Sequence, residues 1–400
     1  MLAAMAAMQT RIDAAPRAYG ADSIYTRMFG LRPLLCGRGH TTAFGGSLMP
    51  AEVMRAMIEA NDYFIDLNEL NVAAGRRIAE VMQAEAAIVT AGAFSAMLLG
   101  AAACLSGTDP AKIDALPHPT WPKRECLIQK AHRENYDRAY RSAGMVLREF
   151  ESREQLAQAI GPNTAMIAAL ASTEKAAAKD PRIMKPQEFV ELGRKAGVPV
   201  LIDAAAEIPP PETLTRFTQM GFDLVALSGG KGLLGPQGTG ILAGRKELIA
   251  AAALNHSPNT GVGRGMKVGK EEIVGLVAAV NLYAARDHDH VHATWNKKVH
   301  FLAAELQGIP GVTAQPQSAA NGHDHGFLEL VFRWDPKIVP LTGKSLAEKL
   351  RTGEPRIIYY PEYGDEHSGV LQTRSMKEGE EIRVARRLRE LFLAETKRRA

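Results

Sequence analysis

The chain has few cysteines and no long apolar run. Its 400 residues include only three cysteines, Cys36, Cys104 and Cys126, and no pair of them has CxxC spacing. A sparse, odd-numbered set argues against a disulfide framework or a zinc site and favours a reducing cytoplasm. The most apolar later segment, residues 91–105, contains two glycines and is shorter than the roughly 18 residues of a membrane-spanning helix. We therefore expect a soluble, cytoplasmic protein without a membrane partner.

The chain also has little net charge. The formal charge is +4, and 46% of the residues are hydrophobic, which is ordinary for a globular protein. This balance gives no reason to expect nucleic-acid binding, although an anionic small molecule would not be repelled. Residues 1–8 are apolar but have no basic residues before them, so they predict a helical arm rather than a signal peptide.

The middle of the chain alternates short apolar runs with helical patterns, such as 95–105 and 186–196. This alternation predicts an α/β fold, a mostly parallel sheet of seven strands with helices on both faces. The last two strands are joined only by the Gly/Pro-rich loop 229–237, which is too short for a crossover helix, so the final strand should be antiparallel. The expected strands are Ala86–Thr90, Glu125–Lys130, Gly144–Arg148, Thr164–Ala171, Pro199–Asp203, Asp223–Ser228 and Gly238–Ala243.

Length and pattern together predict three parts. Residues 1–44 form an N-terminal arm, residues 45–285 a large domain and residues 286–400 a small α+β C-terminal domain. One long helical stretch is expected over 270–307. Shorter elements are expected after it, at 327–332, 345–350, 356–360 and 378–397.

Two residues at predicted strand ends point to a cofactor. Lys231 lies in Leu-Ser-Gly-Gly-Lys-Gly directly after the strand 223–228, where paired glycines permit a tight turn that presents the amine to a cleft. Asp203 ends the strand 199–203 and is followed by three alanines, which leave room for a flat ring. The alternatives are a solvated lysine on a phosphate loop and an aspartate that caps the next segment.

A third segment suits a phosphate group. Thr-Ala-Gly-Ala-Phe-Ser follows the strand 86–90 and opens a helix, so the main-chain N–H groups of Gly92, Ala93 and Phe94, with the Ser95 hydroxyl, form an anion cradle. Ser228 adds a second hydroxyl. Such turns are common by themselves. A phosphate cradle, an acid and a lysine, in this order along the chain, nevertheless meet the needs of pyridoxal phosphate (PLP), with Lys231 as the Schiff-base lysine and Asp203 facing the pyridinium nitrogen.

Other residues are weaker candidates. His132 follows the strand 125–130 and would stack on the cofactor ring; the alternative is a surface histidine. Anionic substrates would be bound by cations, and the candidates are Arg264, Lys267 and Arg356, each of which could equally be a solvated surface charge. Arg374 is a further cation of this kind.

The histidine-rich segment 287–292 has an i, i+4 pair, His288 and His292, but no strong third ligand. We therefore expect a solvated helix face and no metal site, and the same holds for His323 and His325.

Five motifs, taken together, resemble the selenocysteine synthase (SelA)-like branch of fold-type I PLP-dependent enzymes, which includes D-glucosaminate-6-phosphate ammonia-lyases. The likeness covers residues 31–282 and is carried by residues 45–50 (GGSLMP), 128–133 (IQKAHR), 203–207 (DAAAE), 228–237 (SGGKGLLGPQ) and 266–276 (MKVGKEEIVGL).

The resemblance implies the fold-type I transferase fold and supports the roles of Lys231, Asp203 and His132. It also implies a homodimer or larger assembly with active sites at subunit interfaces. The chain departs from the family pattern in the arm before residue 45, where Arg38 and His40 are inserted, so both are added as candidate substrate ligands. About 30 residues precede the region of likeness, too few for the tRNA-binding domain of selenocysteine synthases.

These observations predict a PLP-dependent lyase. The expected reaction is α,β-elimination on a small β-hydroxy or otherwise β-substituted amino acid or amino-sugar acid, which gives a keto acid and ammonia. The first alternative is β-replacement by a sulfur or selenium nucleophile, which would use the same residues. A non-catalytic RNA-binding homologue is the second alternative, and the intact Lys231 and Asp203 count against it.

Overall fold

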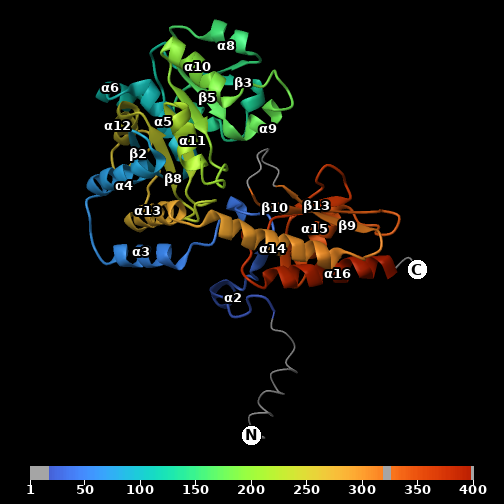
Figure 1. Ribbon diagram of the computed structural model, residues 1–400. Helices are drawn as coiled ribbons and strands as arrows, with labels where there is room; N and C mark the ends of the chain where they lie inside the picture. The colour runs from blue at the N-terminus through green and yellow to red at the C-terminus, as the bar shows by residue number, and fades with distance from the viewer. Residues whose placement is uncertain (1–17, 319–325, 398–400) are drawn as a thin grey trace. The chain divides into compact units, whose positions relative to one another are not determined.

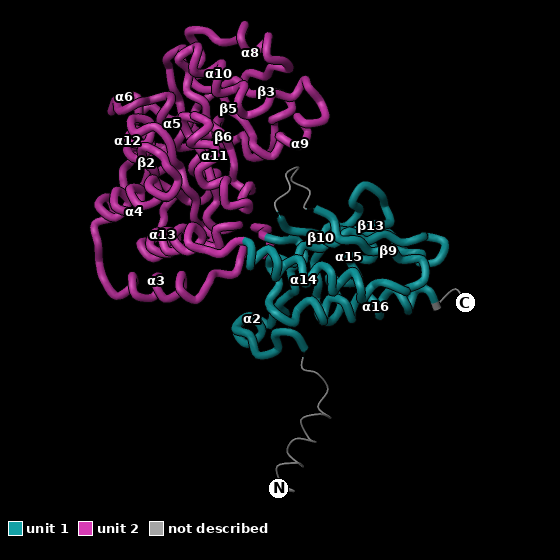
Figure 2. The backbone as a smooth tube through the Cα atoms, viewed as in Figure 1, with its two compact units in different colours: residues 1–39, 289–320, 326–400 teal, residues 40–288, 321–325 magenta. Residues whose placement is uncertain are grey.

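The computed structural model describes residues 18–318 and 326–397, and these form two compact units (Figure 2). The large unit comprises residues 40–288, and the small unit combines the N-terminal segment up to residue 39 with the chain from residue 289 onward. The helical arm expected over residues 1–8, and His323 and His325, lie outside the described residues.

The large unit contains the expected seven-stranded sheet, in the order β2-β8-β7-β6-β5-β3-β4. Figure 1 labels four of these strands, β2, β8, β5 and β3. Neighbouring strands of the sheet are parallel except at β8, which is antiparallel to both β7 and β2, so the prediction of a reversed last strand is confirmed. The strands are β2 (Ala86–Thr90), β3 (Glu125–Gln129), β4 (Val146–Phe150), β5 (Thr164–Leu170), β6 (Val200–Asp203), β7 (Leu224–Ser228) and β8 (Gly240–Gly244).

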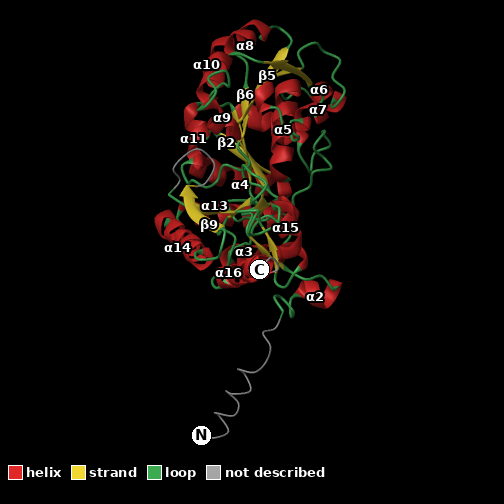
Figure 3. Ribbon diagram, turned by 90° about the vertical axis from the view of Figure 1, so that its right-hand side faces the viewer, coloured by secondary structure: helices red, strands yellow, loops and turns green. Residues whose placement is uncertain are grey.

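Helices cover both faces of this sheet, as Figure 3 shows with helices in red and strands in yellow. One face packs against α4, α10, α11 and α13, and the other against α5, α7 and α12. The helices of the large unit are α3 (Ala51–Asn61), α4 (Leu67–Met82), α5 (Gly92–Ser106), α6 (Pro110–Ala115), α7 (Arg138–Ser142), α8 (Arg153–Ala159), α9 (Glu174–Ala177), α10 (Pro186–Ala196), α11 (Thr213–Met220), α12 (Lys246–Asn255) and α13 (Lys270–Ala284).

Two sequence-based boundaries were wrong. The strand expected at 144–148 begins two residues later, because Gly144 has a φ of +107° and its N–H closes the end of α7 on the Arg141 carbonyl. The helix expected over 270–307 is two helices, α13 and α14 (His288–Leu306). At the break, Nε2 of His288 lies 2.9 Å from the Tyr283 carbonyl oxygen, one of the terminal acceptors of α13.

The small unit is an α+β structure with a four-stranded antiparallel sheet, β12-β13-β10-β9, and a parallel pair, β1 with β11. Its apolar core includes Leu35, Phe332, Trp334 and Phe392. Besides α14, its elements are α2 (Ile24–Phe29), β1 (Leu34–Cys36), β9 (Val312–Ser318), β10 (Leu328–Trp334), α15 (Gly343–Thr352), β11 (Arg356–Ile358), β12 (Tyr360–Pro361), β13 (Ser368–Leu371) and α16 (Glu380–Lys397).

Candidate active site

The predicted cofactor residues meet at the carboxyl edge of the large sheet. Asp203 is the last residue of β6, Ser228 is the last residue of β7, and Lys231 follows three residues later. Gly240 pairs with Ser228 on one side and with Thr90 on the other, so these three residues form one row across the sheet. The carboxyl ends of parallel strands are where α/β folds bind ligands.

The loop that carries Lys231 is folded tightly on itself. The Gly229 N–H donates to the Thr239 carbonyl at 2.9 Å, and the Gly235 N–H donates to the Gly229 carbonyl at 2.9 Å. A Cβ at Gly232 would collide with the Ile208 carbonyl oxygen, so the chain after Asp203 packs directly against the lysine loop. This close approach requires glycine next to the lysine.

Two of the resemblance motifs also reach this loop. A Cβ at Gly46 would collide with the Gln237 side chain, so the segment 45–50 lies against the end of the lysine loop. A Cβ at Gly229 would contact Leu276 of α13. Motifs far apart in the sequence therefore form the walls around Lys231.

Asp203 is buried and held by several partners. Its side chain is 5% exposed, and Oδ1 accepts a hydrogen bond from the Ala205 N–H at 2.9 Å. Burial raises the pKa of this carboxyl, while the Ala205 N–H and the Lys231 charge oppose that shift. A cationic ring nitrogen beside Asp203 would favour the ionised form further.

The start of α5 fits a phosphate group. No side chain caps this helix, and Gly92 begins it with a φ of +80° and open space where a Cβ would be. The Ser95 hydroxyl is buried and has no hydrogen-bond partner within residues 18–318 and 326–397. Ala93 and Phe94 supply the next N–H groups of the same turn. An uncapped helix start with an unsatisfied hydroxyl is chemically suited to an anion, so the residues present fit PLP.

His132 lies just past β3 and is buried in the large unit. Its ring is 1% exposed and packs against Phe189 of α10, with 4.8 Å between ring centroids. Nδ1 accepts a hydrogen bond from the Leu170 N–H at 3.0 Å, and Nε2 lies 3.3 Å from the Met184 carbonyl oxygen. Burial lowers its pKa to about 4, so the imidazole is neutral. This placement favours a structural role, and stacking on the cofactor stays an untested prediction.

Two carboxyl groups that sequence reasoning missed lie near Lys231 and Asp203. Glu134 lies two residues after His132 and is half-buried. Burial first, and then the charge of Asp203, raise its pKa to about 7. Glu207 precedes Ile208, whose carbonyl oxygen packs against Gly232. Burial, together with the charges of Glu174 and Asp203, raises its pKa to about 7. Both lie in or next to recognisable motifs, but no spacing rule signals a half-buried carboxyl with a raised pKa.

The predicted substrate cations lie in both units. Arg264 and Lys267 are exposed on the loop before α13, and His40 is half-buried at the start of the large unit. Arg38 and Arg356 belong to the small unit. The Arg38 guanidinium lies 4.3 Å from the centroid of the Tyr360 ring.

Arg356 is already engaged, because its guanidinium donates to the Arg32 carbonyl at 2.8 Å and to the Arg351 carbonyl at 3.1 Å. That geometry favours a structural role for Arg356. In the small unit, Arg374 is surrounded by protein and donates to Oε1 of Gln372 at 2.9 Å.

The histidine-rich segment is less solvated than we predicted. His292 is buried, and its ring packs against Trp295 and Phe327, each with centroids 5.3 Å away. Within the described parts of the chain, no group of three or more His, Cys, Asp or Glu side chains is arranged to hold a metal ion. The same residues include no helix long and apolar enough to cross a membrane.

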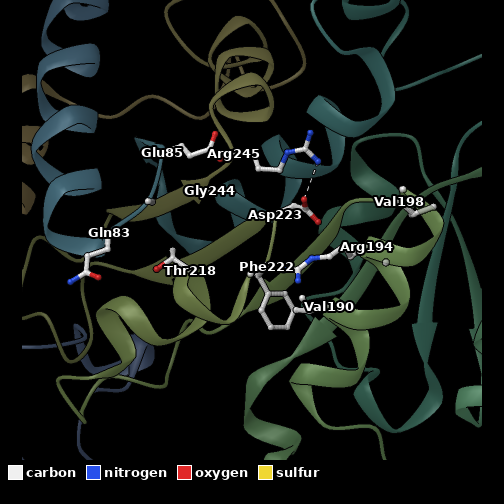
Figure 4. Close-up of a pocket in the computed structure, with 14 residues that line it drawn as sticks. Gln83, Glu85, Val190, Arg194, Val198, Thr218, Phe222, Asp223, Gly244 and Arg245 are labelled. Atoms are coloured by element: carbon white, nitrogen blue, oxygen red, sulfur yellow. Dashed lines mark hydrogen bonds and ion pairs between the residues drawn. The ribbon is translucent and has the colours of Figure 1, made fainter.

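A cavity of about 490 Å³ lies at the opposite edge of the large sheet (Figure 4). It is lined by Asp223, which precedes β7, and by Gly244 at the end of β8. Two of its charged groups pair with each other: Asp223 accepts from Arg245 at 3.0 Å, and it also accepts from the Val200 N–H at 2.8 Å. The cavity is therefore separate from the edge that carries Lys231.

Comparisons with known proteins agree with this geometry. Residues 149–332 match the family model of class-V aminotransferases. The chain is 32% identical over 391 residues to a 5'-C-glycyluridine monooxygenase-decarboxylase from Streptomyces sp., with 95% of this chain and 94% of that protein covered. It belongs to the fold-type I family of PLP-dependent enzymes.

Three further likenesses place the chain within this family. It is 27% identical to the D-glucosaminate-6-phosphate ammonia lyase of Salmonella typhimurium, with 92% of this chain and 98% of that protein covered. A solved structure of a D-glucosaminate-6-phosphate ammonia-lyase matches with a TM-score of 0.80 and 26% identity over 93% of this chain and 99% of that chain. An L-seryl-tRNA(Sec) selenium transferase from Moorella thermoacetica is 34% identical, but over 139 residues that cover only 32% of this chain and 28% of that protein. The predicted SelA-like membership and the PLP cofactor are confirmed.

Proposed function

We propose that this protein catalyses α,β-elimination on an anionic, β-substituted amino acid or amino-sugar acid, releasing ammonia and a keto acid. The observation that carries the proposal is the cluster around Lys231. An amine, the buried Asp203 carboxylate and two carboxyl groups with a pKa near 7 converge at one edge of the sheet. Elimination needs both a base for the Cα proton and an acid for the leaving group, and this cluster holds both.

Each residue has a definite task in this reaction. PLP, when bound, supplies an electron sink for the negative charge at Cα. The Lys231 amine would take the Cα proton, and Asp203 would keep the ring nitrogen protonated. The start of α5, with Ser95 and Ser228, would hold the phosphate. Glu207 is protonated up to about pH 7 and can give its proton to a departing β-hydroxyl, which leaves as water. Water then hydrolyses the product to the keto acid and ammonia.

The likeness to ammonia lyases supports elimination over the alternatives. The relative of that name matches along 98% of its length and shares its fold with this chain, whereas the selenium transferase match covers 28% of that protein. A β-replacement enzyme would use the same residues, so product analysis decides between them. We expect ammonia and keto acid whether or not a thiol is added; a thioether product formed only with thiol would favour replacement.

The experiment that tests the proposal compares the wild-type protein with Lys231→Ala. We expect the wild type to show a visible cofactor absorbance band and to release ammonia and keto acid from a panel of β-hydroxy and phosphorylated amino acids of both configurations. The variant should lose both the band and turnover. A Lys231→Ala protein that keeps them would refute the assignment. A wild type that shows no band and retains tRNA in a salt-dependent way would favour the RNA-binding alternative.

A second candidate function is oxygen-dependent decarboxylation. It is favoured by the 32% identity to the monooxygenase-decarboxylase, which extends over 95% of the chain. The two candidates differ in their co-reactant, since elimination needs no oxygen. Carbon dioxide release that requires oxygen would support decarboxylation, while ammonia and keto-acid release without oxygen would support elimination.

We also propose that the protein is a homo-oligomer with active sites at subunit interfaces. The large unit exposes a run of apolar side chains between α3 and α4, where Tyr63 is 71% exposed and Phe64 is fully exposed. Another copy of the chain would remove this surface from water. The three free cysteines agree with the reducing environment of the cytoplasm, where we expect the enzyme to act.

A further inference from the structure

The cavity shown in Figure 4 forms where two helices end and two strands begin. α10 and α11 each end at a glycine with a left-handed backbone, Gly197 with a φ of +64° and Gly221 with a φ of +98°, and the chain then enters β6 and β7. Both glycines line the cavity, whose volume of about 490 Å³ is in the range of pockets that hold small organic molecules. The space is therefore large enough for an organic ligand.

Two carboxyl groups line this cavity, and each already has partners in the protein. Asp223 accepts hydrogen bonds from Arg245 at 3.0 Å and from the Val200 N–H at 2.8 Å. Oε2 of Glu85 accepts from the Lys246 N–H at 3.0 Å, at the start of α12, where the helix dipole favours a negative charge. The cavity therefore does not need a cationic ligand to balance these carboxylates.

The Arg194 side chain lines the same cavity, and no carboxylate of the described residues binds it. It belongs to the last turn of α10 and is exposed to solvent. A Cβ at Gly221 would collide with its Nη2, so the guanidinium lies directly over the end of α11. Within the described parts of the chain this guanidinium makes no hydrogen bond or ion pair, and in Figure 4 the dashed line joins Asp223 to Arg245 instead. Because both carboxylates are engaged elsewhere, Arg194 leaves a positive charge on the cavity wall.

The groups that remain for a ligand are hydrogen-bond donors. A guanidinium offers parallel N–H groups that match the oxygens of a carboxylate or a phosphate. On the opposite side of the cavity in Figure 4, Gln83 uses Oε1 to accept from Nε2 of Gln219 at 2.6 Å, which leaves its own amide N–H groups to donate. These donors suit a ligand with an oxyanion at Arg194 and a neutral acceptor, such as a hydroxyl or a carbonyl, at Gln83.

We propose that this cavity is a second ligand site, which binds a small organic oxyanion, a carboxylate or a phosphate monoester, on the Arg194 guanidinium. The site goes beyond the proposed reaction, because the cavity lies at the amino ends of β6 and β7, whereas Asp203 ends β6 and Lys231 follows β7. A ligand bound there stabilises the folded chain, since the unfolded chain has no such site.

Isothermal titration calorimetry tests the site on the full-length protein loaded with PLP, so that the phosphate cradle at α5 is already filled. The probes are glycerol 3-phosphate and succinate, which separate a phosphate monoester from a carboxylate. We expect saturable binding of at least one probe, and the one that binds identifies the oxyanion. Arg194→Gln should weaken that binding at least about tenfold, because it removes a charge-assisted contact made through two N–H groups.

Two further variants separate the ligand contact from the charge of the helix end. Lys195→Gln removes the same charge from the next residue of α10, which is exposed and does not line the cavity, so the affinity should not change. Arg194→Lys keeps the charge without the planar fork, so its affinity should fall between those of the wild type and Arg194→Gln. Thermal unfolding gives a second measurement: the bound probe should raise the midpoint of the wild type and of Lys195→Gln, but not that of Arg194→Gln.

The proposal is overturned if neither probe binds the wild type, or if Arg194→Gln binds as tightly as the wild type. An equal loss in Arg194→Gln and Lys195→Gln would also overturn it, because Arg194 would then serve only to offset the carbonyl ends of α10 and α11. Since the titration measures binding and not turnover, its result does not depend on whether the enzyme catalyses elimination.

Discussion

At the scale of single residues, the site depends on which side chains are buried and what they contact. Lys231 and Asp203 have recognisable positions in the sequence, and the structure brings them to one edge of the sheet. His132 also has a recognisable position, and its buried ring packs against that of Phe189. A residue at a strand end can therefore serve the fold, the chemistry or both.

His132 provides a test of this difference. Replacing it with alanine would leave the buried Leu170 N–H without its acceptor and open a cavity against Phe189. We expect the free energy of unfolding to fall by about 2–4 kcal/mol, measured by urea denaturation at pH 7. His118→Ala is the control, because His118 is exposed in the same unit. If His132→Ala lowers the free energy of unfolding no more than His118→Ala does, the structural role of His132 is contradicted.

The pH dependence of stability follows from the same burial. The pKa of His132 in the folded protein is about 4, below its ordinary value of 6.5, so the unfolded chain takes up a proton first as the pH falls. This contribution to stability is complete above pH 6.5 and is lost as the pH falls from there towards 4. The His132→Ala protein should lack this part of the decline.

At the scale of elements, glycine contacts hold the lysine loop between its neighbours. Gly232 lies against the Ile208 carbonyl, Gly46 against Gln237 and Gly229 against Leu276. None of these contacts lies within one helix or strand. They place two of the resemblance motifs, 45–50 and 266–276, and the residue just after a third, Ile208, against the lysine loop.

We expect Gly232→Ala to displace Lys231. The added methyl group would collide with the Ile208 carbonyl, and overpacking of this kind costs about 1–3 kcal/mol. Equilibrium dialysis against PLP should show weaker binding, with a smaller visible absorbance band. Gly161→Ala is the matched control, since a Cβ there would meet only the Ala159 carbonyl oxygen at 4.0 Å. Equal affinity in the two variants would show that this contact does not position the lysine.

At the scale of the whole molecule, several apolar side chains before α4 are left exposed by residues 18–318 and 326–397. Ile58 on α3 is 64% exposed, and Phe64 is fully exposed. Phe64→Asp should weaken self-association, so light scattering after size exclusion should give a smaller mass than for the wild type. Val146→Asp, on the edge strand β4, is the control and should leave the mass unchanged. A wild-type monomer would refute the proposed assembly.

The sequence by itself determined the seven-stranded sheet, the reversed direction of its last strand and the pair Lys231 and Asp203. These features depend on local information: alternation of apolar runs with helices, loop length, and glycines beside a lysine. The sequence did not predict β9. This strand contains Gln315, Pro316 and Gln317 and few apolar residues, a composition that does not suggest a strand. It is tolerated because β9 is at the edge of its sheet and pairs on one side only.

Only the tertiary structure decided which groups share the site. Glu134 and Glu207 look like surface carboxylates in the sequence. Their pKa values are raised by burial and by the charge of Asp203. Asp203 ends β6, whereas Glu134 lies on the turn after β3. The same holds for His132, whose partners come from β5 and from the chain just before α10. Burial and charge proximity are properties of packing between distant segments, and no local pattern encodes them.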